Sequence, residues 1–195
     1  MNQNKKLHPF VQNLVLSAMF LALGLVLPFV TGQIPEIGSM LLPMHIPVLL
    51  CGLICGWPYG AAVGFILPPL RYVLFGMPPI FPNGVAMAFE LMTYGLLSGL
   101  LYSRARWHCV ISLYRCLIAA MIGGRVVWGV VRVLLTGVAS EPFTWQMFLS
   151  GAFLTAIPGI ILQLVFIPAM MVALDRAGMV RFHRKSRDAS CTAEK

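Results

Sequence analysis

The chain has 195 residues, of which 59% are hydrophobic and only 10% are charged. A soluble domain needs about a quarter of its residues charged, so this composition excludes that class, and the apolar runs along nearly the whole chain indicate an integral membrane protein. The net charge of +8 does not indicate nucleic-acid binding, because the basic residues lie at the termini and in one short connection rather than in a stripe interleaved with aromatic residues.

The first apolar run, residues 11–30, follows Lys5 and Lys6 and so resembles a signal peptide. It is about 20 residues long, which exceeds the roughly 7–15 residues of a signal-peptide core, and no A-x-A cleavage motif follows. We therefore expect a retained first helix. Five further segments complete a bundle of six transmembrane helices in an all-α membrane protein: 43–56, 58–75, 82–103, 109–135 and 147–175. The second is short, so it is tilted, re-entrant or begins inside the preceding loop.

Four glycines recur at every fourth position across the turn between the second and third segments: Gly52, Gly56, Gly60 and Gly64. Pro58 interrupts the helix between them. Small residues at this spacing let helix backbones approach closely, so the sequence predicts a tight hairpin of two helices.

No group of residues indicates catalysis or metal binding. Cys51 and Cys55 lack C-x-x-C spacing and are expected to be small buried hydrophobic residues. The four histidines are scattered and predict no ligand cluster: His8, His45, His108 and His183. The sequence lacks H-E-x-x-H, G-x-S-x-G and the G-x-x-x-x-G-K-[ST] loop that binds ATP phosphates. We therefore predict no metal, no cofactor and no enzymatic activity in this chain.

Basic residues predict the topology. With an even number of spans, both termini share one side, and ten of the fourteen Lys and Arg residues fall there: Lys5, Lys6, Arg104, Arg106, Arg176, Arg181, Arg184, Lys185, Arg187 and Lys195. The opposite loops at 31–42, 76–81 and 136–146 contain none. By the positive-inside rule, both termini are cytoplasmic. The chain then divides into three parts: a cytoplasmic segment at 1–10, a six-helix membrane domain at 11–177 and a basic cytoplasmic tail at 178–195.

Glu90 lies in the middle of the apolar segment 82–103, where a charged residue costs about 2.5–3.5 kcal/mol on insertion scales. It lies about eight residues, or roughly 12 Å, below the outer end of its segment, and Arg125 lies about ten residues, or roughly 15 Å, from the same surface. A guanidinium is suited to a buried pair with a carboxylate. We therefore predict an ion pair between Glu90 and Arg125.

Two helical stripes extend this pair into a candidate pocket in the outer half of the membrane. One stripe holds Asn83, Met87, Glu90 and Tyr94, and the other holds Arg125, Trp128 and Arg132. All of these except Met87 are predicted to bind substrate. Glu90 neutralises one Arg, and the Arg that is left over favours an anionic group on a ligand. The alternative is a structural ion pair that only fixes helix packing. Gln163 lies deeper and is expected to form an interhelical hydrogen bond.

Three further stretches carry a family resemblance: VLLCGLICGWPYGAAVGFI, AMAFELMTYGLLSGLLY and GAFLTAIPGIILQ. Over residues 10–177, the pattern resembles the substrate-binding S component of energy-coupling factor (ECF) transporters. The resemblance implies a multi-pass protein of a bacterial or archaeal cell membrane. Such a protein binds a vitamin or related micronutrient near the outer surface, through helices four to six and the first outer loop.

The resemblance also implies partners, namely a transmembrane coupling protein and two cytoplasmic ATPases. Ala18 and Ala22, in the stretch SAMFLALG, match the A-x-x-x-A motif with which the family's first helix packs against the coupling protein. They are the residues expected at the partner interface.

Two other classes of membrane protein are alternatives. A stand-alone secondary transporter would use Glu90 to carry a proton or a coupling ion. A membrane enzyme lacks support, because no nucleophile–base pair or metal cluster shares a helix face. The Arg that Glu90 does not neutralise favours a carboxylate- or phosphate-bearing nutrient such as pantothenate or nicotinate. Neutral or cationic vitamins stay open, since Glu90 can face the ligand instead.

Overall fold

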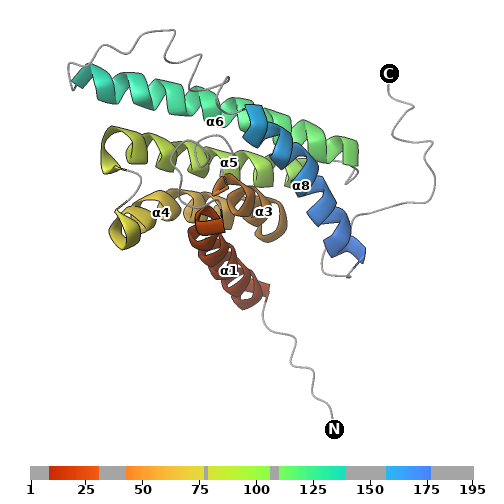
Figure 1. Cartoon of the computed structure of the whole chain (residues 1–195). Coiled ribbons are helices and arrows are strands. Elements are labelled where there is room, and N and C mark those ends of the chain that lie inside the picture. The colour runs from red at the N-terminus through yellow and green to blue at the C-terminus, as the bar shows by residue number, and fades with distance from the viewer. Residues whose placement is uncertain (1–8, 31–42, 77–78, 106–109, 139–156, 177–195) are drawn as a thin grey trace.

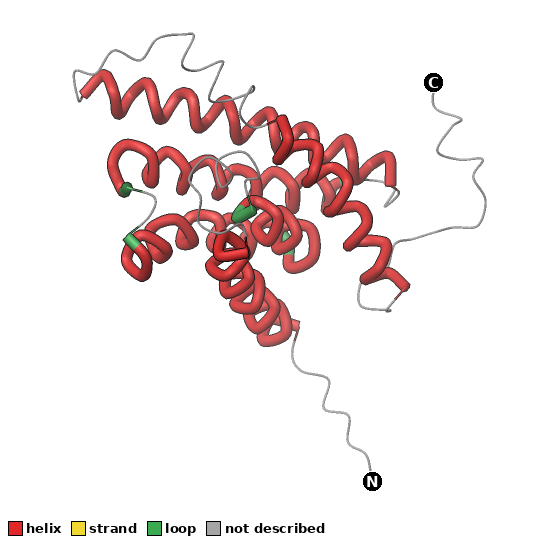
Figure 2. The backbone as a smooth tube through the Cα atoms, viewed as in Figure 1, coloured by secondary structure: helices red, strands yellow, loops and turns green. Residues whose placement is uncertain are grey.

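A computed structural model describes residues 9–30, 43–76, 79–105, 110–138 and 157–176 (Figure 1). Throughout this part of the chain the regular structure is helical, without strands (Figure 2). Its elements are α1 (Pro9–Val30), α3 (His45–Cys55), α4 (Trp57–Phe75), the π-helical turn η1 (Ile80–Gly84), α5 (Val85–Arg104), α6 (Val110–Val138) and α8 (Ile157–Arg176). The all-α class is thus confirmed. Each expected segment overlaps one of these α-helices, although 147–156 lies outside the described residues.

The described helices carry the surface of a membrane protein. Four of them are long and apolar enough to cross a bilayer: α1, η1 continued by α5, α6 and α8. Large apolar side chains are exposed on every described α-helix except α3, as expected where lipid rather than water covers the surface. α3 has 11 residues, or roughly 16 Å, and nearly all of them are buried. The second segment is therefore a short helix enclosed by the others.

Glycines bring α3, α4 and α5 into backbone contact. A methyl group added at Gly60 in α4 would lie 2.6 Å from the Cα atom of Gly52 in α3, and one added at Gly95 in α5 would overlap the carbonyl group of Gly60. Gly56 joins α3 to α4 with a φ of 98°, which glycine adopts without strain. The predicted tight hairpin is confirmed. The sequence pattern did not predict that α5 joins this hairpin through Gly95 and Gly99, which also stand four residues apart.

A methyl group added at Gly95 would find no free space, because the atoms around it belong to the backbone of α4 and cannot rotate away. We expect Gly95→Ala to destabilise the protein by about 1–3 kcal/mol, the usual cost of overpacking, and to lower the melting temperature in detergent. Gly123→Ala is the matched control, because its methyl would meet only the end of the Leu97 side chain, which can rotate. Equal losses in the two variants would contradict the backbone contact.

α5 is the central helix of the described structure. It contacts α3, α4 and α6, and these neighbours surround its inner face (Figure 1). The buried core takes side chains from α1, α3, α4, α5, α6 and α8, and Cys51, Cys55 and Cys116 are buried free thiols among them, as expected for the two cysteines of α3. A polar residue on the inner face of α5 is therefore enclosed by protein rather than lipid.

Candidate functional site

Glu90 lies on this inner face of α5 and is only 2% exposed. Its Oε1 atom lies 3.1 Å from Nη1 of Arg125 on α6, which confirms the ion pair predicted from the sequence. Tyr94, one turn along α5, donates a hydrogen bond from its hydroxyl to the same Oε1 atom at 3.0 Å. Charge-assisted bonds of this kind offset the cost of removing the carboxylate from water.

His45, the first residue of α3, completes the Glu90 cluster, which consists of His45, Glu90, Tyr94 and Arg125. Its Nε2 atom lies 3.6 Å from Oε1 of Glu90, and its ring meets the Tyr94 ring edge-on with centroids 5.0 Å apart. His45 was not predicted to belong to the site, because its contact with Glu90 arises only when α3 packs against α5. One signal was available: His45 is the single polar residue of an otherwise apolar short segment.

Several atoms of the Glu90 cluster lack hydrogen-bond partners within the described residues. They are Nε and Nη2 of Arg125 and both ring nitrogens of His45. A buried polar group without a partner costs about 1–3 kcal/mol, and more when it is charged. The two Arg125 atoms are donors, so the group that would satisfy them is an acceptor such as a carboxylate or a phosphate.

Gln163 of α8 is likewise buried, at 2% exposure, and its Nε2 atom has no hydrogen-bond partner in the described part of the chain. Among these residues, Nε2 therefore does not make the interhelical hydrogen bond expected for Gln163. α8 contacts both α3 and α6, the helices that carry His45 and Arg125. Gln163 thus adds a further unsatisfied polar group to the interior of the bundle.

A second cluster of polar residues lies two helical turns from the Glu90 cluster. Arg132 of α6 donates a hydrogen bond from Nη1 to Oδ1 of Asn83, which lies in η1. The guanidinium carbon of Arg132 lies 5.9 Å from the centroid of the Trp128 ring, where a cation–π attraction acts. The sequence placed these three residues in one pocket, and the structure brings them together. Asn83 and Trp128 are both uncharged, so these contacts hold the guanidinium of Arg132 in place without neutralising it.

The two groups are linked by the pairing of α5 with α6. Asn83 precedes Glu90 by seven residues, and Arg132 follows Arg125 by seven, so two antiparallel helices place both pairs in register. The six residues predicted to bind substrate therefore lie along one helix–helix interface. Among the described residues, no group of three or more His, Cys, Asp or Glu side chains could hold a metal ion.

Ala18 and Ala22 lie on an exposed face of α1. The buried stripe of the same helix contains Ser17, Phe20 and Gly24, and Gly24 packs against Leu67 of α4. The two alanines therefore point away from the bundle and leave a shallow surface that a second helix can approach.

A family model described as "ECF transporter, substrate-specific component" matches residues 12–171. This match covers most of the chain, so the chain belongs to that family. It is a multi-pass membrane protein and a substrate-specific transporter component, which binds a small molecule and works with membrane partner components rather than acting as an enzyme itself. Neither the comparison with curated proteins nor the comparison with solved structures gave a match.

Proposed function

We propose that this chain captures a vitamin or related micronutrient at an outward-facing pocket, from which it is imported by ATP hydrolysis in partner subunits. One observation carries the proposal. Inside a chain of a substrate-binding family, the buried Glu90–Arg125 pair leaves guanidinium donors without a partner among the described residues. In a purely structural ion pair these donors would stay unsatisfied at a cost in stability, whereas a substrate would supply an acceptor for them.

The proposed topology is a bundle of six transmembrane helices with both termini in the cytoplasm. The distribution of Lys and Arg supports it, since the three loops on the opposite side carry neither. In this topology η1 lies at the outer surface, so Asn83 and Arg132 form the outer level of the pocket. Glu90 and Arg125 form the inner level, about 10 Å deeper along α5 and α6.

The proposed substrate is an anion. Its carboxylate or phosphate accepts hydrogen bonds from Arg125, and Arg132, held by Asn83, adds positive charge at the outer level. The Trp128 ring offers an aromatic face beside that charge. Together with Glu90 and Tyr94, these are the residues to which we assign substrate contact.

Mass spectrometry of small molecules that co-purify with the protein tests this function. We expect one anionic nutrient in near-stoichiometric amount with the unaltered chain. It should be absent from a Glu90→Leu/Arg125→Met double variant, in which neither member of the pair leaves a buried charge behind. Recovery of the same molecule from the double variant would contradict the assigned pocket.

The proposed partners are a transmembrane coupling protein and two cytoplasmic ATPases, with Ala18 and Ala22 at the docking face. We expect Ala18→Leu and Ala22→Leu to leave substrate binding by the isolated chain unchanged and to lower uptake by the assembled complex roughly tenfold. Bulk on this face holds the partner helices apart at a cost of about 1–3 kcal/mol. Ala119→Leu, at an exposed alanine of α6, is the matched control. Normal uptake by both α1 variants would refute the docking assignment.

A further inference from the structure

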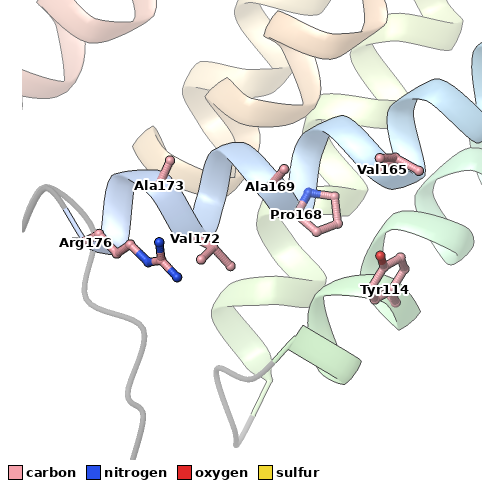
Figure 3. Close-up of a pocket in the computed structure, with 7 residues that line it drawn as sticks. All are labelled: Tyr114, Val165, Pro168, Ala169, Val172, Ala173 and Arg176. Carbon is pink, nitrogen blue, oxygen red and sulfur yellow. The ribbon is translucent and has the colours of Figure 1, made fainter.

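A groove of about 580 Å³ opens on the surface between α6 and α8, apart from the Glu90 cluster (Figure 3). One wall is the exposed face of α8, with Val165, Ala169 and Ala173 along it. Tyr114 of α6 stands opposite, and Arg176 closes the end of the groove where α8 ends. The groove is thus apolar along its length and has a cation at one end.

The length of the groove matches one leaflet of a bilayer. Val165 and Arg176 are eleven residues apart, which is roughly 16 Å of helix, or about half of a hydrocarbon core that is ~30 Å thick. The groove therefore runs from the membrane surface at the end of α8 to about the middle of the bilayer. An acyl chain of a phospholipid extends over the same depth.

The groove is shallow and open to the surface, and its lining along α8 is apolar. This shape suits a flexible hydrocarbon chain that lies along the helix.

The charge at the end of the groove selects among lipids. The guanidinium of Arg176 points back along α8 toward Val172, whereas Tyr114 lies farther along the groove, opposite Pro168 (Figure 3). A guanidinium is a donor for phosphate oxygens, and guanidinium pairs with phosphate are among the stronger hydrogen-bonded contacts. A net negative headgroup complements this end of the groove better than a zwitterionic one does.

We propose that this groove binds an anionic phospholipid, with an acyl chain along α8 and its phosphate held by Arg176. The test uses the full-length protein in a neutral detergent, titrated with dioleoyl phosphatidylglycerol or dioleoyl phosphatidylcholine, which share their acyl chains. Bound lipid is counted by native mass spectrometry. Phosphatidylglycerol is expected to bind more tightly, and Arg176→Gln to weaken it about fivefold, which is the effect of one basic residue near a membrane surface.

Two pairs of variants locate the site. Arg104→Gln removes an exposed cation at the end of α5, outside the groove, and is expected to leave binding unchanged. Ala169→Phe fills the groove and is expected to weaken both lipids, whereas Ala62→Phe on an exposed position of α4 is not. Melting temperatures of all four variants show that each one is folded before its affinity is compared.

Four outcomes would overturn the proposal. Equal losses for Arg104→Gln and Arg176→Gln would mean that charge attraction is diffuse, and equal affinities for the two lipids would remove the role of charge. Full binding by Ala169→Phe would place the lipid elsewhere. Glycerol 3-phosphate, which has the phosphate but no acyl chain, would identify a plain anion site if it bound as tightly as the lipid. None of these outcomes depends on the nutrient that the chain transports.

Discussion

Glu90→Ala is expected to destabilise the protein by about 3–5 kcal/mol and to abolish substrate binding, because it leaves Arg125 buried beside no carboxylate. Tyr94 would also lose the acceptor of its hydroxyl. Thermal unfolding in detergent and substrate titration measure the two losses. Thr93→Ala is the matched control, since this neighbouring hydroxyl is exposed and donates to the carbonyl of Phe89 on the same helix, so its loss should change stability and binding little.

The double variant Glu90→Leu/Arg125→Met separates a structural role from a binding role. Replacing both members of a buried ion pair by apolar residues is often neutral or stabilising, so melting should recover toward that of the unaltered protein. Substrate binding should stay lost if the pair contacts the substrate. Stability losses that simply add between the two single variants would mean that the side chains do not interact, and restored binding would make the pair structural only.

Arg132→Ala is expected to weaken substrate binding by about 2–5 kcal/mol, the usual effect of removing one partner from a buried charged contact. The melting temperature should change little, because Asn83 and Trp128, which contact Arg132, are only partly buried. Arg132 itself lies near the end of α6, where a lost contact disturbs little of the core. Isothermal titration with the co-purified nutrient measures the affinity.

Two companion variants sharpen the Arg132 result. Asn83→Ala should weaken binding less than Arg132→Ala, since it removes the group that positions the guanidinium and leaves its charge in place. Arg115→Ala removes an exposed guanidinium of the same helix and should have no effect on affinity. Unchanged binding in Arg132→Ala would exclude this residue from the site.

The helices and the Glu90–Arg125 pair could be predicted because one-dimensional rules determine them. Apolar run length locates the helices, and depth along two antiparallel segments places a carboxylate and a guanidinium at the same level. The same register explains the contact between Asn83 and Arg132, which sequence analysis placed in one pocket without pairing them. Asn83 precedes Glu90 by seven residues and Arg132 follows Arg125 by seven, and these two spacings on antiparallel helices are sufficient to predict the contact.

The roles of His45 and Gly95 were not predicted, since they depend on how the helices pack against one another. His45 reaches Glu90 only because the short helix is enclosed between its neighbours, and Gly95 matters only because its backbone touches Gly60 of α4. The four-residue spacing of Gly95 and Gly99 indicates a close helix contact but does not identify the partner helix. Packing between helices thus determined what the sequence patterns missed.

Uptake of the identified nutrient into vesicles tests the central claim most directly. One set of vesicles contains this chain alone, and another contains it with a coupling protein and two ATPases. We predict ATP-dependent uptake only in the second set, with nutrient bound but not accumulated in the first. Uptake by the chain alone, driven by a proton or ion gradient and lost in Glu90→Gln, would contradict the account and identify a stand-alone secondary transporter.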